Sequence, residues 1–307
     1  MPGGFDHGAL LHAGEDEFVT GALGFLREGL ERGEPALVAL TPRKLALLRE
    51  ALGADAGAVA FADMTELGAN PARIIPAWRE FVDGTGGRPA RGIGEPVWPG
   101  RSPAELVECH RHEALLNVAF AGAAAFRLLC PYDTTVFGPD VIEQVHRSHP
   151  VLVEDGVERE SPACAPAHEH AAPFAGTLPD PEAPVQTLSF DLSNLPAVRR
   201  TVLAHGAEAG LRAPRDEDLV LAVNELATNS VRHGGGRGTL RLWRERGSVV
   251  CEVRDRGGIR DPLAGRHRPD GSSTGGYGLW LANQVCDLVQ VRTTPQGGVV
   301  RVHMRIR

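Results

Sequence analysis

Short apolar runs alternate with helical patterns through the first half of this 307-residue chain. Runs such as "PALVAL", "AVAFAD" and "AFRLLCPYD" have the length and composition of buried strands. Helical stretches follow these runs at about residues 15–32, 42–52, 71–83, 103–118 and 138–148. Repeated strand–helix units predict an α/β domain with a mostly parallel sheet and helices on both faces.

Polar and aromatic side chains stand at the ends of these predicted strands and in the helix "CHRHEALLN". They form a candidate sensory-ligand site of His12, Glu95, Trp98, Glu113, Tyr132 and Asp133, because ligands bind at the carboxyl ends of parallel strands. Loop capping is the alternative role for each residue at a strand end. The carboxylate and indole of "GEPVW" suit an apolar or cationic ligand. This half has no GxxxxGK[ST] phosphate loop, so nothing in it predicts nucleotide binding.

Residues 151–186 change in character, because proline, alanine and acidic residues crowd together and periodicity is lost after about Val157. We therefore predict a linker over 161–185 that joins a domain at 1–160 to a second domain at 186–307. His168 and His170, with Cys164 nearby, suggest a metal site. A solvated linker is the better interpretation, because no fourth ligand is in sight.

The stretch "LAVNELATNSVRHGGG" predicts a helix that begins near Pro214 and ends near His233. Glu225 and Asn229 are four residues apart and share one flank of this helix, beside its apolar face. Two strands follow, and the second ends in Asp255, Gly257 and Gly258. A carboxylate at a strand end, next to glycines, suits recognition of the edge of a nucleotide base.

A long polar segment, residues 259–274, comes next and predicts a lid. Gly275, Gly276 and Gly278 then precede an apolar helix, whose free N–H groups and dipole favour phosphate. In the last strand Val300, Val302, Met304 and Ile306 alternate with arginine and histidine. This alternation predicts a half-buried antiparallel strand.

In this order the three motifs resemble the Bergerat-fold ATP-binding domain of the GHKL superfamily, and most of all the anti-sigma-factor serine kinases. The resemblance covers residues 186–307 and implies an α+β fold with a mixed or antiparallel sheet and helices on one face. It implies that Asn229 coordinates Mg²⁺ between the phosphates of ATP and that Glu225 is the general base. It also implies that Asp255 reads the adenine amino group.

The same resemblance assigns further residues to the nucleotide site. The backbone of "GGYGL", which includes Gly275, Gly276, Gly278 and Leu279, would wrap the phosphates, and His233 matches a histidine common in the anti-sigma branch. One departure concerns Gly257 and Gly258. Many sensor kinases have DxGxG where this chain has "DRGGI". The sequence therefore does not determine the geometry of the lid.

The first half resembles the MEDS sensory domain over about residues 5–155, on "HGALLHAGEDEFVTGALGFLREGLERGEPALVAL", "GIGEPVWPGRSPAEL" and "HEALLNVAF". This resemblance implies a RecA-like α/β layer without its phosphate loop, and a sensory role. It does not name the ligand.

Together the two resemblances imply a sensory anti-sigma factor. Such a protein binds Mg²⁺-ATP, phosphorylates serine or threonine of a STAS-type anti-anti-sigma partner, and thereby controls the availability of a sigma factor. The ATP domain is expected to form homodimers. One alternative is an ATP-binding module that sequesters the sigma factor without catalysis. Another is a sensor histidine kinase, which needs a phospho-accepting histidine on a helix before the ATP domain. Here a proline-rich linker precedes it, and His205 lies within the domain's first predicted helix.

Composition excludes several other classes. A formal net charge of -7 argues against a broad nucleic-acid-binding surface. No apolar run approaches the roughly 20 residues of a membrane span, and "MPGGFDHG" lacks the start of a secretory signal, so we expect a cytoplasmic protein. The five cysteines form no CxxC pair, which predicts free thiols, mostly in the cores.

Overall fold

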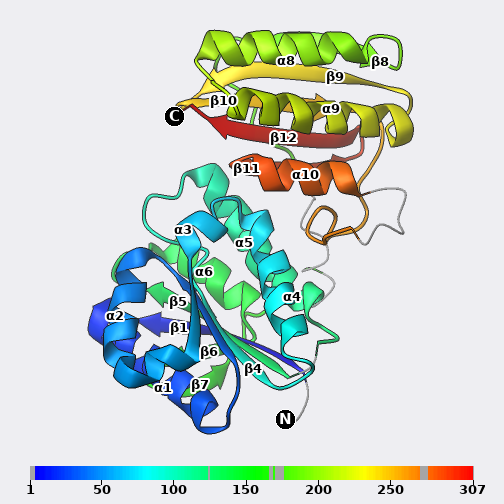
Figure 1. The fold of residues 1–307 in the computed structure, drawn as a ribbon. Coiled ribbons are helices and arrows are strands. Elements are labelled where there is room, and N and C mark those ends of the chain that lie inside the picture. Colours follow the sequence, from blue (N-terminus) through cyan, green and yellow to red (C-terminus); the bar gives the residue numbers. More distant parts are fainter. Residues whose placement is uncertain (1–3, 124, 166–168, 170–175, 270–275, 307) are drawn as a thin grey trace. The chain divides into compact units, whose positions relative to one another are not determined.

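The computed structural model of the chain describes residues 4–123, 125–165, 169, 176–269 and 276–306. The chain divides into two compact units, Met1–Pro173 and Phe174–Arg307. The division lies within residues 161–185, where the sequence predicts a linker. His168 and His170 lie outside the described residues. Each unit has its own sheet and is described by itself (Figure 1).

The first unit contains a seven-stranded sheet with the order β3-β2-β4-β5-β1-β6-β7. Its strands are β1 Phe5–His12, β2 Ala36–Leu40, β3 Val59–Asp63, β4 Ala90–Gly94, β5 Phe126–Asp133, β6 Val151–Glu154 and β7 Val157–Glu160. All neighbours pair in parallel except β7, which is antiparallel to β6. The predicted α/β fold with a mostly parallel sheet is confirmed. The short strands β6 and β7 were not predicted, because they lie where the composition turns linker-like.

Helices cover both faces of this sheet (Figure 1). On one face α1 (Gly14–Glu31) and α2 (Pro42–Leu52) bury Phe18, Leu26 and Leu48 against the sheet. On the other lie α4 (Ile74–Gly84), α5 (Pro103–Ala119) and α6 (Pro139–Ser148). Trp78 of α4 packs on β4, where a Cβ on Gly92 would lie 2.9 Å from the indole ring. Shorter turns complete the unit: η1 Gly53–Ala58, α3 Met64–Leu67 and η2 Pro71–Arg73.

The second unit contains a five-stranded antiparallel sheet with the order β11-β12-β10-β9-β8. Its strands are β8 Gln186–Asp191, β9 Arg237–Glu245, β10 Ser248–Arg254, β11 Leu288–Thr294 and β12 Gly297–Arg305. The helices α8 Leu195–Ala209, α9 Arg215–His233 and α10 Tyr277–Val285 share one hydrophobic core with the sheet. Val302 and Met304 of β12 lie in that core, as their alternation predicted. The predicted α+β fold is confirmed.

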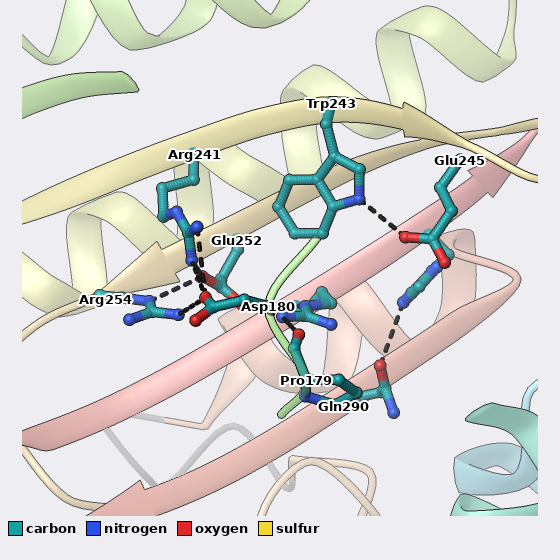
Figure 2. Close-up of polar contacts among 10 residues, drawn as sticks. Pro179, Asp180, Arg241, Trp243, Glu245, Glu252, Arg254 and Gln290 are labelled. Atoms are coloured by element: carbon teal, nitrogen blue, oxygen red, sulfur yellow. Dashed lines mark hydrogen bonds and ion pairs between the residues drawn. The ribbon is translucent and has the colours of Figure 1, made fainter. Parts of the chain in front are cut away.

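The other face of this second sheet carries a network of charged side chains (Figure 2). Glu252 is fully buried there and accepts hydrogen bonds from Arg241, Arg254 and Arg301 at 2.6–2.9 Å. Burial alone would raise the pKa of Glu252, but Arg254 and Arg301 outweigh it and lower that pKa. Arg301 also donates to the carbonyl of Pro179 at 2.9 Å, so the end of the linker segment lies against this face.

The structure also bears on the predicted free thiols and on the predicted absence of a membrane-spanning segment. All five cysteines are free, and four of them are buried. Among the residues that the structure describes, no helix combines the length and the apolar composition needed to cross a membrane.

Candidate functional site

A cavity of about 410 Å³ opens in the second unit between α9, the end of β10, the segment that follows β10 and the start of α10. This size lies within the range of small-molecule sites, roughly 300–1,000 Å³. Several residues singled out from the sequence line it: Asn229, His233, Asp255, Gly257, Gly258, Gly276 and Leu279. The motifs on α9, β10 and α10 are thus brought to one place.

Asp255 is held in a fixed orientation at one end of the cavity. Ser230 on α9 donates its hydroxyl to Asp255 Oδ2 at 2.5 Å, and the N–H of Gly257 donates to Oδ1 at 2.7 Å. The N–H of Asp255 in turn donates to the carbonyl of Gly298 at 3.1 Å. A carboxylate fixed in this way still has lone pairs free to accept from an amino group. Ser230 was missed from the sequence, because its partner lies 25 residues away.

Two glycines allow the backbone to approach Asp255 closely. A Cβ on Gly234, at the end of α9, would overlap the Asp255 carboxyl group. A Cβ on Gly297 would overlap the Asp255 carbonyl oxygen, and Gly297 has a φ of +133°. Gly234, the first glycine after His233, therefore has a steric role that the sequence alone did not reveal.

The start of α10 lies against the flank of α9 that carries Glu225 and Asn229. A Cβ on Gly278 would lie 2.5 Å from Asn229 Nδ2 and 3.3 Å from the Cβ of Glu225. Gly276 precedes the helix with a φ of +99° and forms its N-cap. The first N–H groups of a helix have no intrahelical acceptor, so this end favours an anion beside Asn229. Glu225 is half-buried next to this contact, and Gly275 lies outside the described residues.

The segment predicted as a lid begins as a packed wall of the cavity. Ile259 N–H donates to Thr293 Oγ1 at 3.2 Å, and Asn283 Nδ2 donates to the carbonyl of Gly265 at 2.9 Å. Leu263 between them is buried. The first part of the segment is therefore tied to β11 and α10, whereas residues 270–274 lie outside the described part of the chain.

In the first unit the candidate sensory residues fall into separate groups. Side chains alternate between the two faces of a strand. Accordingly His12 packs near Phe18 of α1, whereas Tyr132 donates its hydroxyl to Glu113 of α5 at 2.8 Å. Asp133, like His12, lies by the α1 end and accepts from Gly14 N–H at 3.4 Å. The six residues therefore do not line one pocket.

Glu95 and Trp98 already have cationic partners within the chain. Lys44 Nζ lies 2.7 Å from Glu95 Oε1, and Thr41 donates two hydrogen bonds to Oε2. The guanidinium of Arg101 lies 3.5 Å from the centroid of the Trp98 ring. Burial, together with the charge of Lys44, lowers the pKa of nearby His12. These side chains thus serve internal contacts in the described structure.

Comparisons with known proteins agree with this division into two units. Residues 6–150 match the family described as MEDS, the methanogen/methylotroph DcmR sensory domain. Residues 188–304 match the histidine kinase-like ATPase domain. The resemblances to the MEDS domain and to the GHKL-type ATP-binding domain are confirmed, and the ATPase match implies that the second unit binds ATP. No curated protein matches the sequence of this chain.

Among solved structures, one match is the crystal structure of the RsbU and RsbW domains of Rv1364c from Mycobacterium tuberculosis, at 20% identity and a TM-score of 0.31. It covers 40% of this chain and 32% of that chain. A likeness of this extent carries no argument about fold or partners.

Proposed function

We propose that this chain, which joins an N-terminal MEDS sensory domain to a C-terminal histidine kinase-like ATPase domain, is an anti-sigma factor with protein serine/threonine kinase activity. Its substrate would be a STAS-type anti-anti-sigma protein, and its second partner a sigma factor that it holds inactive. The observation that carries the proposal is the contact between Asn229 of α9 and Gly278 at the start of α10, beside the cavity lined by Asp255.

The geometry of this contact fits a magnesium nucleotide. An amide oxygen such as Asn229 Oδ1 is a hard ligand that Mg²⁺ accepts together with phosphate oxygens and water. The start of α10 supplies N–H groups for those phosphates. When bound, the ion would offset phosphate charge, and Asn229 would hold it there. Asp255 and Ser230 would orient the adenine.

Glu225 is the residue proposed to move the proton. It lies one helical turn before Asn229, on the same flank of α9. The hydroxyl oxygen of the partner would form a bond to the γ-phosphorus while the bond from that phosphorus to the bridging oxygen breaks and ADP leaves. Glu225 would accept the hydroxyl proton, directly or through water.

The remaining parts of the proposal concern regulation. The MEDS domain would bias the choice between phosphorylating the STAS partner and holding the sigma factor. Homodimerisation through the ATPase domain belongs to the same proposal.

The test is incubation of the purified full chain with Mg²⁺ and γ-labelled ATP, with and without candidate STAS proteins from the same genome. Acid-stable label on one STAS protein supports the proposal and identifies the partner. Acid-labile label on the chain itself would instead indicate a histidine kinase. Tight ATP binding without transfer to any candidate would favour the module that sequesters by contact alone.

A further inference from the structure

Four side chains that the proposed function does not use converge in the core of the first unit. They are His7 of β1, Glu113 of α5, Cys130 of β5 and His149 at the end of α6. Each offers one ligand atom, and these atoms all lie within 4.8 Å of one another. All four residues are buried, and all lie within the part of the chain that matches the MEDS family.

Hydrogen bonds on the far side of both imidazole rings fix which nitrogen carries the proton. Asn117 Nδ2 donates to the Ser148 carbonyl at 2.7 Å, so its Oδ1 must accept from His7 Nδ1 at 3.1 Å. His149 Nδ1 lies 2.9 Å from the Val145 carbonyl, which can only accept, and 3.0 Å from Ser148 Oγ, whose hydroxyl donates to the Gln144 carbonyl. In the neutral tautomers, both Nε2 atoms therefore carry lone pairs.

Both of these lone pairs face the same carboxylate oxygen. His7 Nε2 lies 3.0 Å and His149 Nε2 lies 3.4 Å from Glu113 Oε2. The other oxygen, Oε1, is occupied by the Tyr132 hydroxyl at 2.8 Å. The thiol of Cys130 has one proton and can satisfy only one of these three acceptors. Two lone-pair-bearing atoms thus remain face to face, in a place without solvent, where an unpaired polar atom is costly.

Protonating both histidines is an unfavourable way to relieve this repulsion. Two imidazolium rings would lie side by side, with centroids 4.2 Å apart, in a fully buried position. A single divalent cation at the centre would satisfy all of the acceptors together.

The separations of the ligand atoms match a tetrahedral zinc site. Bond lengths of about 2.0–2.1 Å to nitrogen or oxygen and about 2.3 Å to sulfur place tetrahedral ligands about 3.3–3.6 Å apart. Four of the six observed separations are 3.0 and 3.4 Å from nitrogen to oxygen, 3.6 Å from His7 Nε2 to Cys130 Sγ, and 3.7 Å from that sulfur to Glu113 Oε2, and the other two lie within 4.8 Å.

We propose that His7, Glu113, Cys130 and His149 bind one divalent transition-metal ion of the zinc class inside the sensory domain. Two imidazoles, a thiolate and a carboxylate form a ligand set that zinc accepts. Asn117, Val145 and Tyr132 supply the outer hydrogen bonds that orient the ligands. The protein fills all four positions, so the ion ties β1, α5, β5 and the end of α6 together and does not present an open catalytic site.

The test uses the full chain, treated with a chelator and then titrated with Zn²⁺ or Co²⁺ in the absence of nucleotide. We expect one ion per chain, a thiolate-to-cobalt charge-transfer absorption, and a higher melting temperature of the first unit with metal than without. Uptake of less than one ion per chain at micromolar metal would overturn the proposal, and so would cobalt binding without that absorption.

Two cysteine variants locate the ion. Cys130→Ser should lose the charge-transfer absorption and weaken zinc binding more than about tenfold. Cys109→Ser is the matched control, because Cys109 is also buried in this unit but donates to the Pro96 carbonyl at 3.1 Å. It should keep both properties. Equal zinc affinity in the two variants would place the ion elsewhere. If Cys130→Ser does not fold, His149→Gln and the wild-type absorption still decide the question.

Discussion

The two units of this chain place their polar side chains in opposite ways. In the ATPase domain Asn229, Asp255 and Gly276 stand at the ends of elements, around a cavity that a ligand can enter. In the MEDS domain His7, Glu113 and Cys130 lie within packed elements and His149 lies at the end of one, and all four are shut off from solvent. An open set of this kind is built for exchange of a substrate, whereas a closed set must be satisfied from within.

The largest expected effect is on catalysis at the open site. Replacing Glu225 by Gln removes the proposed proton acceptor and keeps the shape of the side chain. We expect transfer of phosphate to the proposed STAS partner to fall about 10²–10⁴-fold, while the free energy of unfolding changes by no more than about 0.5 kcal/mol because the side chain is only half-buried. If single-turnover kinetics give the variant the wild-type rate of phosphate transfer, Glu225 is not the base.

At the closed site we expect substitutions to affect the stability of the first unit. Glu113→Ala removes the buried carboxylate that both imidazoles face and leaves the Tyr132 hydroxyl without its acceptor, and we expect the first unit to lose about 3–5 kcal/mol of stability. Tyr132→Phe removes only one hydrogen bond, so its cost should be smaller, about 1–2 kcal/mol. Urea denaturation measures both. A Glu113→Ala variant with the stability of the wild type would contradict the contrast between the two sites.

These two cases also show why the sequence predicted one site better than the other. The ATP motifs are contiguous stretches, each at the end of one predicted element, so their order predicted both the fold and the candidate site. The buried cluster joins residues of four elements, from His7 to His149, and no two of its members are closer than 17 positions in chain order. The apolar run of the first strand begins at Gly8, which left His7 outside it, and strand alternation sent Tyr132 and His12 to opposite faces.

Within the open site, Asn229 should matter for the metal and its neighbours on α9 should not. Asn229→Ala removes the proposed oxygen ligand, and we expect the affinity for Mg²⁺-ATP to fall at least about tenfold, or about 1.4 kcal/mol. Asn224→Ala is the matched control, since the half-buried Asn224 on the same helix accepts a hydrogen bond from Arg199 at 2.9 Å. Isothermal titration with and without Mg²⁺ checks both, and equal affinities in the two variants would exclude the metal role.

Gly234 tests whether close backbone packing sets the orientation of Asp255. The Cβ of Gly234→Ala would overlap the Asp255 carboxyl group, so this carboxylate must move away from Ser230. We expect this variant to bind ATP about tenfold more weakly. Its affinity for a nucleotide that lacks the adenine amino group should change little. Gly24→Ala, at an exposed helical position with open space around it, is the control that should leave binding unchanged.

The smallest effect is expected on the outer face of the second sheet, where the linker segment ends. Asp180 lies 3.4 Å from Arg241 and 3.8 Å from Arg254, but its side chain is 82% exposed (Figure 2). Solvent screens such pairs, so Asp180→Ala should cost about 0.5 kcal/mol or less.

Glu252 on the same face is the buried counterpart of Asp180. Because the arginines lower the folded-state pKa of Glu252, its contribution is present above its unfolded pKa and is lost as the pH falls through the folded value. The stability difference between Glu252→Gln and the wild type should therefore shrink in acid, whereas that of Asp180→Ala should stay near zero throughout.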